Sequence, residues 1–264
     1  MMRRREFLAL AAAAPAVGPV RTRPAGKVET VFKSPGPKPN GLQATKEGLW
    51  ILDQGDNRVY LVDYKDGKVL RALQTESDRG SGITFDGEAV WIASTYNRKI
   101  IRSDARTGRT LASFDTPGAG VVKWTESRRS PLAPPEPPRP AAPARKAPEP
   151  RQATGAHGME WRDGKLWIAV PPSQTIYRVN PAGFAVELKF PTAGNRPHGI
   201  GWEGRWLWCT DSNLNAFFKH DPATGEIVEK IQLADSDPLP HGMSIWQGWM
   251  WYCDDVGVVC RLKM

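Results

Sequence analysis

The sequence predicts an all-β protein, and three observations support this fold class. The chain of 264 residues contains 11 Trp, 25 Gly and 24 Pro, and glycine-rich turns between short aromatic segments favour strands. A tryptophan-containing segment recurs about every 40 residues. With 40% hydrophobic and 24% charged residues, the composition is globular and excludes a collagen-like or wholly disordered chain. No run approaches the ~18 apolar residues that a membrane-spanning helix requires.

The repeat consists of five segments that begin with a glycine and an apolar residue. These anchor glycines are Gly41, Gly82, Gly158, Gly199 and Gly242. A tryptophan stands nine residues after each of them, at Trp50, Trp91, Trp167, Trp208 and Trp251. An Asp or Asn follows the first four glycines at a second fixed spacing, at Asp63, Asp104, Asn180 and Asp221. A period of about 40 residues with four short strands is typical of a β-propeller blade, and the tryptophans are expected to pack between blades.

The fifth repeat is too short for four strands, because the chain ends at Met264, the position that corresponds to these Asp and Asn residues. A Gly-Lys-Val sequence at 26–28 precedes Gly41 by the same distance as the Gly-Lys-Val sequence at 67–69 precedes Gly82. The segment from 26 through Phe32 is therefore predicted to supply the missing outer strand. We expect five four-stranded blades closed by this N-terminal strand, since closure leaves no exposed first or last edge.

Residues 1–25 are predicted to be a signal peptide and linker that precede the propeller of residues 26–264. The pair Arg4-Arg5 is followed by Phe7-Leu8, an alanine-rich stretch and the small-residue sequence Ala14-Pro15-Ala16. This order resembles a twin-arginine (Tat) signal. It implies export of the folded protein by the Tat translocase, a periplasmic or extracellular location, and no transmembrane span once the signal is removed.

Residues 117–156 are predicted to be a disordered, basic insertion on the face where one blade leads to the next. They hold seven Lys or Arg against three Glu, and nine prolines fall between Pro131 and Pro150. The insertion is interpreted as a lid or a tether; a sixth blade is the alternative, which its prolines disfavour. The formal charge of +8 resides largely in this insertion and the signal, so nucleic acid is not an expected partner.

Two positions of each repeat are expected to meet at one mouth of the central channel. The residue before the anchor glycine, here called the rim residue, is Asn40, Ser81, His157, His198 or His241. The third residue after the tryptophan is Asp53, Ser94, Val170, Asp211 or Asp254. Imidazoles and carboxylates bind divalent ions such as Mg²⁺, Mn²⁺ or Zn²⁺ and also serve as acids and bases. In the alternative, structural interpretation the histidines bond a neighbouring blade and the acids cap turns.

The three cysteines leave two interpretations open. Cys253 and Cys260 are predicted on neighbouring strands of the last blade, where they form either a disulfide or two free buried thiols. Cys209 stands alone, and an unpaired cysteine is no evidence of a nucleophile.

The fourth repeat, Pro-His-Gly-Ile-Gly-Trp-Glu-Gly followed by Leu-Trp and by Asp-Pro-Ala-Thr-Gly at 221–225, resembles the blades of the virginiamycin B lyase (streptogramin lyase) family and of YncE-like YVTN propellers. The resemblance covers nearly all of residues 26–264 outside the insertion. It implies metal-dependent elimination that opens a cyclic depsipeptide ester. By position it implies His198 or His241 as the catalytic base and Asp211 and Asp254 near the metal. The expected substrate contacts are Asn40, Ser81, His157 and Asp53.

Two hypotheses of different classes follow. The first is a metal-dependent lyase or hydrolase of a cyclic ester, lactone or small peptide at the channel mouth. The second is a non-catalytic propeller that binds a small ligand or a protein partner at the same rim. A glutaminyl cyclase-like propeller is a third interpretation, based on its Trp-rich blades, with no acidic constellation in the sequence to single it out.

Overall fold

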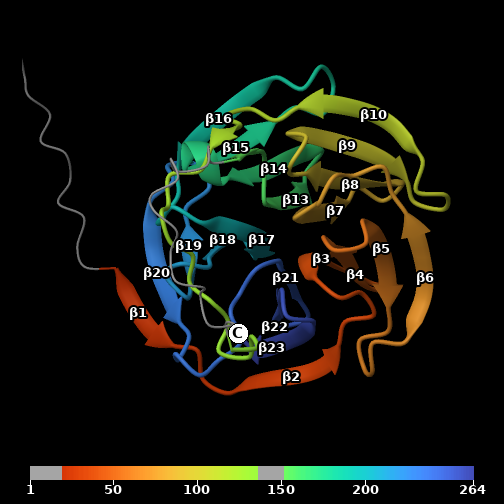
Figure 1. Ribbon diagram of the computed structural model, residues 1–264. Helices are drawn as coiled ribbons and strands as arrows, with labels where there is room; N and C mark the ends of the chain where they lie inside the picture. The colour runs from red at the N-terminus through yellow and green to blue at the C-terminus, as the bar shows by residue number, and fades with distance from the viewer. Residues whose placement is uncertain (1–19, 136–151) are drawn as a thin grey trace, which may run out of the picture.

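A computed structural model describes residues 20–135 and 152–264. Within these ranges, five sheets are arranged as blades around a central axis (Figure 1). Each blade has four strands of the repeat, and a further strand extends the sheet of one of them. Consecutive strands of each blade pair antiparallel, and the first strand lies nearest the axis. The predicted five-bladed β-propeller is therefore confirmed.

The strands follow the repeat. Blade 1 contains β3 (Pro39–Thr45), β4 (Gly48–Asp53), β5 (Arg58–Val62) and β6 (Val69–Gln74). Blade 2 contains β7 (Gly82–Phe85), β8 (Ala89–Ser94), β9 (Lys99–Asp104) and β10 (Thr110–Asp115). Blade 3 contains β13 (Gly158–Arg162), β14 (Lys165–Val170), β15 (Thr175–Val179) and β16 (Val186–Pro191), with a 3₁₀ turn at Pro171–Ser173. Blade 4 contains β17 (Pro197–Glu203), β18 (Trp206–Asp211), β19 (Ala216–His220) and β20 (Ile227–Gln232).

Blade 5 joins the two ends of the propeller. Its inner strands are β21 (Met243–Trp246), β22 (Trp249–Asp254) and β23 (Val258–Lys263), and its outer strand is β2 (Val28–Lys33). β2 pairs antiparallel with β23, so that Val28 lies opposite Leu262. The N-terminal strand closes the last blade as predicted, and the hydrogen bonds of this pair hold the ring together.

A further strand precedes the predicted start of the propeller. β1 (Arg21–Pro24) pairs in parallel with the outer strand β20 of blade 4. Arg23 Nε lies 2.7 Å from Glu229 Oε1 across this pair. Residues that the sequence analysis assigned to a linker thus extend a blade. Residues 1–19, which carry the expected Tat signal, lie outside the described residues.

The described part of the insertion lies across the channel mouth. β11 (Gly120–Val121) and β12 (Ala153–Thr154) form a short antiparallel pair, and within the described ranges no further blade is formed. Residues 122–130, here called the strap, then cross toward blades 4 and 5 (Figure 1). Ser130 Oγ donates to Asp254 Oδ2, and Arg128 N donates to Asn213 Oδ1 at 3.0 Å. Polar contacts with the rim therefore position residues that composition alone marked as disordered; residues 136–151 lie outside the described ranges.

The anchor glycines mark places where neighbouring blades approach closely around the axis. A Cβ at Gly158 would lie 1.7 Å from the carbonyl oxygen of His198, and one at Gly199 would lie 2.0 Å from Met243 N. A Cβ at Gly242 would lie 2.6 Å from Asn40 O in blade 1. Each blade thus packs the start of its inner strand against the rim of the next, which leaves no space for a side chain.

The repeated tryptophans lie between the blades, as predicted. Trp50, Trp91, Trp167, Trp208 and Trp251 are each at most 5% exposed. Trp50 stacks on Phe85 of the next blade, with ring centroids 5.7 Å apart. Burial of these large rings adds apolar contact between neighbouring blades.

The cysteines are free thiols. Cys253 pairs with Val259, whereas Cys260 pairs with Tyr252. Directly opposed residues share one face of a sheet and successive residues alternate, so Cys253 and Cys260 lie on opposite faces of blade 5. Cys209 is also buried and free. The register therefore rules out the disulfide that the sequence left open.

In the described residues, no helix is long and apolar enough to span a membrane.

Candidate functional site

Three rim histidines lie next to one another at the channel mouth. His157, His198 and His241 come from blades 3, 4 and 5 and are 8%, 2% and 1% exposed. Their ring centroids are 4.8 Å apart in both neighbouring pairs, with the planes close to perpendicular. The repeat thus places one type of residue at one position in consecutive blades, and the five-fold arrangement brings them into contact.

The hydrogen bonds of His198 determine the direction of a chain of imidazoles. His198 Nδ1 lies 3.1 Å from the carbonyl oxygen of Arg196 and 3.0 Å from Ser212 Oγ. A carbonyl only accepts, and the Ser212 hydroxyl already donates to Pro240 O, so Nδ1 of His198 carries the proton. Nε2 of the neutral ring then accepts from His157 Nδ1 at 3.2 Å. His157 Nε2 is left with a lone pair that has no partner among the described residues.

The three imidazoles are neutral at pH 7. Burial lowers the pKa of His157 to about 3, and the positive charge of Arg196 adds to this effect. Burial lowers the pKa of His241 to about 4, and it holds the pKa of His198 well below its usual value. Neutral rings can accept hydrogen bonds, which imidazolium ions cannot.

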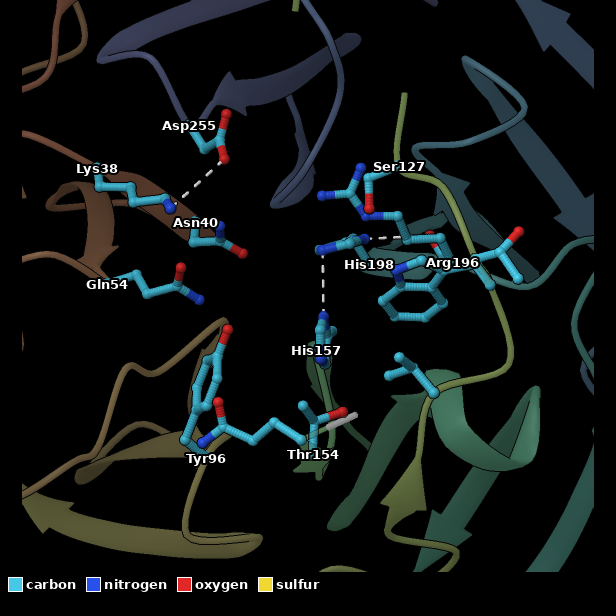
Figure 2. A pocket seen from close by; sticks show the side chains of 14 residues that line it. Lys38, Asn40, Gln54, Tyr96, Ser127, Thr154, His157, Arg196, His198 and Asp255 are labelled. Carbon is cyan, nitrogen blue, oxygen red and sulfur yellow. Dashed lines mark hydrogen bonds and ion pairs between the residues drawn. The ribbon is translucent and has the colours of Figure 1, made fainter. Parts of the chain in front are cut away.

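A pocket of about 390 Å³ opens beside His157 and His198 (Figure 2). The blades contribute Lys38, Asn40, Gln54, Tyr96, His157, Arg196, His198 and Asp255 to its wall. The insertion contributes Val122, Trp124, Thr125, Ser127, Gln152 and Thr154. The ring of Trp124 meets His157 edge-on, with centroids 6.3 Å apart. The strap therefore forms one side of the pocket.

The carboxylates that the sequence analysis placed near a metal accept hydrogen bonds from the backbone. Asp211 accepts from Arg196 N at 2.9 Å and from Leu214 N at 3.0 Å. Asp254 accepts from Leu239 N at 2.7 Å, from Val256 N and from Ser130 Oγ. In both blades the acid fastens the loop that carries the rim residue, which is the structural interpretation of these positions.

The expected substrate contacts of blades 1 and 2 separate into two groups. Asp53 accepts from Lys38 N at 2.6 Å and from Gly55 N at 2.8 Å, and it does not line the pocket. Ser81 Oγ accepts from Gln54 Nε2 at 2.9 Å and lies outside the lining as well. Asn40 does line the pocket, and its Oδ1 has no partner among the described residues.

The cations of the site were not identified from the sequence. Lys38 and Arg196 both stand two residues before a rim residue, and Arg79 occupies the same position in blade 2. A basic residue stands at this position in three of the five repeats, and this recurrence could have identified Lys38 and Arg196 from the sequence. Tyr96, Trp124 and Asp255 carry no such repeat signal.

A second ring of polar side chains lies two residues after the anchor glycines. Gln43, Thr84, Glu160 and Ser244 are buried there and face the axis. Thr84 Oγ1 lies 2.5 Å from Gln43 Oε1 and 3.5 Å from Glu160 Oε1. Burial raises the pKa of Glu160 to about 8, so its carboxyl group is largely protonated at pH 7.

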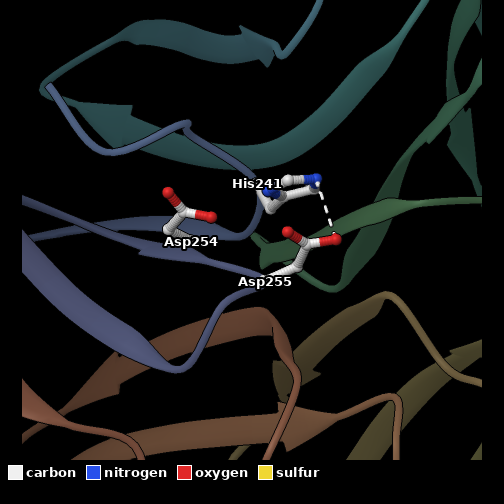
Figure 3. Close-up of side chains that lie close together, drawn as sticks. All are labelled: His241, Asp254 and Asp255. Atoms are coloured by element: carbon white, nitrogen blue, oxygen red, sulfur yellow. Dashed lines mark ion pairs between the residues drawn. The ribbon is translucent and has the colours of Figure 1, made fainter. Parts of the chain in front are cut away.

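Within the described ranges, His241, Asp254 and Asp255 are grouped as a metal-ligand set would be, with atoms within 4.8 Å of one another (Figure 3). His241 Nε2, however, lies 3.3 Å from Nη2 of Arg196, which donates to it. Asp254 already accepts three hydrogen bonds. A guanidinium group beside the ligand nitrogen repels a second cation, so these residues fit a divalent metal poorly.

Comparisons with known proteins support the fold. No protein-family model and no curated protein matches this chain. The structure of Myxococcus xanthus glutaminyl cyclase is similar over 94% of this chain and 100% of its own, with a TM-score of 0.63 and 11% sequence identity. Virginiamycin B lyase from Staphylococcus aureus, in a catalytically inactive variant with quinupristin, is similar over 86% of this chain and 66% of its own, with a TM-score of 0.49 and 19% identity. A streptogramin B lyase gives a TM-score of 0.49 at 17% identity over 85% of this chain and 64% of its own.

At 11% identity the likeness to the glutaminyl cyclase shows the propeller fold. The chain spans about two thirds of the length of the two lyases. The site has to be interpreted from its own residues.

Proposed function

We propose that the protein binds a small organic molecule in the pocket at the channel mouth. The observation that carries the proposal is the convergence of two cationic side chains and the neutral histidine chain on this one pocket. Neutral imidazoles, the Asn40 amide and the aromatic rings of Tyr96 and Trp124 together offer acceptors, donors and apolar surface. Specific pockets combine these elements to orient a ligand.

The size of the pocket favours a small molecule over a protein partner. Its volume of about 390 Å³ falls within the roughly 300–1,000 Å³ of typical ligand sites. The strap and residues 152–154 cover one side of it, which limits access for a folded protein.

The histidines themselves report on binding. NMR spectra of the protein with ¹³C,¹⁵N-labelled histidine are recorded while small amides, esters, lactones, carboxylic acids and short peptides are added. Binding in the pocket shifts the ring signals of His157, His198 and His241. His220 is an internal control, because it is the fourth histidine of the chain and bonds to Gly225 O on the outer side of blade 4. A library that moves none of the three rim signals would contradict the proposal.

A second candidate function is catalytic, and the His157–His198 chain favours it. A lyase or hydrolase of an ester, lactone or small peptide requires a proton acceptor beside the substrate. His157 Nε2 has no hydrogen-bond partner among the described residues, and His198 Nε2 orients the ring by accepting from its Nδ1. The Nε2 atom is itself buried, so a substrate has to displace the groups that cover it before this base can act. Conversion of any compound that binds is measured with the wild type and with His157→Gln. Binding without turnover leaves the first proposal and removes this one.

The metal-dependent form of this candidate is tested separately. Elemental analysis of protein purified without chelator gives the content of Mg²⁺, Mn²⁺ and Zn²⁺. About one ion per chain that is lost in His241→Ala would establish a metal site in spite of the adjacent guanidinium. Protein that neither contains nor is thermally stabilised by these ions would exclude the metal-dependent form.

We further propose export by the Tat translocase to the periplasm or the exterior, on the strength of the Arg4-Arg5 sequence. Replacing this pair by Lys-Lys should retain the protein in the cytoplasm. Fractionation and N-terminal sequencing of the exported form check both the location and the cleavage site.

A further inference from the structure

Arg196 is held at the channel mouth by its own backbone. Its N–H donates to Asp211 Oδ2 at 2.9 Å. Its carbonyl accepts from Ser212 N at 3.1 Å and from His198 Nδ1 at 3.1 Å. Three hydrogen bonds therefore fix the peptide groups on either side of this residue, and the side chain enters the pocket (Figure 2).

The guanidinium group of Arg196 has neutral hydrogen-bond partners. Nη1 donates to Arg128 O at 3.2 Å and Nη2 donates to His241 Nε2 at 3.3 Å. The ion pairs of the described residues do not include Arg196, whereas Arg23 and Arg261 each pair with a glutamate. Burial lowers the pKa of Arg196 below its usual value, and the negative charges of Asp255, Asp211 and Asp254 offset this only in part. That direction is expected for a charge that the protein compensates incompletely.

Lys38 supplies a second cation on the opposite side of the pocket (Figure 2). Its backbone N–H donates to Asp53 as that of Arg196 donates to Asp211, so the two residues occupy equivalent positions in blades 1 and 4. Lys38 Nζ lies 3.9 Å from Asp255 Oδ2. That distance is at the limit of an ion pair, and the lysine side chain remains 46% exposed.

The charges that line the pocket do not cancel. Lys38 and Arg196 are positive, Asp255 is the one carboxylate among the described lining residues, and the histidines His157 and His198 are neutral. The described lining therefore carries a net charge of +2 − 1 = +1. A monovalent anion would match this charge, whereas a phosphate dianion would exceed it.

We infer that the ligand of this pocket is a small organic carboxylate, whose carboxylate group lies between Arg196 and Lys38. The inference rests on the proposed binding function and names the class of its ligand. A guanidinium group bonds both oxygens of a carboxylate with two parallel N–H donors. The Asn40 side chain and the ring of Trp124 are left to contact the rest of the molecule. The carboxylate also offsets the positive charge that Arg196 exerts on the histidines.

Benzoate and benzamide test this inference, since they match in shape and differ in charge. Each is titrated into the full-length protein, and the ring signals of His157, His198 and His241 are followed by NMR with His220 as the unaffected reference. Benzoate is expected to bind at least about tenfold more tightly than benzamide, because hydrogen bonds to a charged group are stronger than those to a neutral amide. Sodium chloride at equal ionic strength controls for screening.

Matched variants locate the carboxylate. Arg196→Gln and Lys38→Gln should each weaken benzoate binding by about tenfold or more and weaken benzamide binding by a much smaller factor. Lys38→Gln serves as the second variant because the lysine side chain is 46% exposed, so its replacement should leave the fold intact. Arg205→Gln removes the same charge from the turn between β17 and β18, at the opposite end of the propeller, and should have no effect.

The outcomes separate the two proposals. If benzamide binds as tightly as benzoate and moves the three rim signals, the pocket binds small molecules and the carboxylate inference is wrong. Inorganic phosphate that binds more tightly than benzoate also overturns the carboxylate. If neither probe and no library compound moves the rim signals, the proposed function itself fails.

Discussion

Nδ1 of His157 donates a hydrogen bond to Nε2 of His198 across 3.2 Å, which joins blade 3 to blade 4 at the channel mouth. The bond requires His198 to be neutral, because an imidazolium ring has no acceptor. The Arg196 carbonyl and Ser212 hydroxyl then hold the other His198 nitrogen in its protonated form. The tautomers of two buried residues are thereby set by one backbone carbonyl.

The neutral histidines should make the protein sensitive to acid. The unfolded chain takes up protons at the usual histidine pKa near 6.5, whereas the folded pKa is about 3 for His157 and about 4 for His241. The neutral histidines therefore make their full contribution to the free energy of unfolding above pH 6.5, and this contribution is lost as the pH falls toward 4. We expect a loss on the order of 2 kcal/mol per histidine at pH 5. Urea unfolding at pH 7 and pH 5 measures it, and His157→Asn should show a smaller difference between the two pH values; equal differences would refute the assignment.

Glu160 should have the opposite effect at higher pH. Burial raises its folded pKa to about 8 from 4.5, so the folded state holds a proton that the unfolded chain has released. Protonated Glu160 makes its full contribution to the free energy of unfolding below pH 4.5, and this contribution declines until the pH passes about 8. Glu160→Gln should remove a decline on the order of a few kcal/mol, since one pKa unit is about 1.4 kcal/mol. Unfolding of both proteins at pH 5 and pH 8 checks this, and parallel declines would contradict it.

Asp211 should act as a turn cap. Asp211→Ala leaves the N–H groups of Arg196 and Leu214 without their acceptors, which should lower the free energy of unfolding by about 1–3 kcal/mol per unsatisfied group. Asp211→Asn keeps one acceptor oxygen and should lose less. Chemical denaturation measures both variants. If elemental analysis instead finds a bound metal that Asp211→Asn abolishes, the carboxylate is a ligand.

Gly158 should tolerate no side chain. The Cβ of Gly158→Ala would lie 1.7 Å from His198 O, a backbone atom of the next blade. Such overpacking should cost about 3 kcal/mol or more. Gly120→Ala is the matched control, because its Cβ would meet Pro172 at an ordinary 3.8 Å. Thermal unfolding compares the two variants, and similar melting temperatures would show that the blades adjust more freely than the contact indicates.

The cysteines should all react as thiols. Cys253 and Cys260 lie on opposite faces of blade 5, so oxidation cannot join them without a change of register. Denatured protein that was never exposed to reductant should titrate with three thiols per chain. A count of one would demonstrate a disulfide and require a different pairing of β22 with β23.

The sequence predicted the blades more completely than the site. The anchor glycines and tryptophans recur at fixed spacing because every blade makes the same contacts with its neighbour. Their spacing was therefore sufficient to predict five blades and the closing strand. The site depends on differences between blades. His157 was expected to contact substrate and His198 or His241 to act as base, yet the hydrogen bonds leave the unpaired Nε2 on His157. Nothing in the spacing distinguishes these histidines.

The sequence by itself determined the number of blades, their closure and the convergence of the rim residues, because a periodic chain with two-residue alternation repeats the same burial in each blade. Only the tertiary structure decided which polar groups line the pocket and which form hydrogen bonds within the fold. Asp211 and Arg196 are an example: the carboxylate accepts the backbone N–H of Arg196, while the guanidinium group donates to Arg128 O and His241 Nε2 at the pocket. Hydrogen bonding between residues far apart in the chain depends on distances of a few tenths of an ångström, and those distances arise only when the ring of blades is closed.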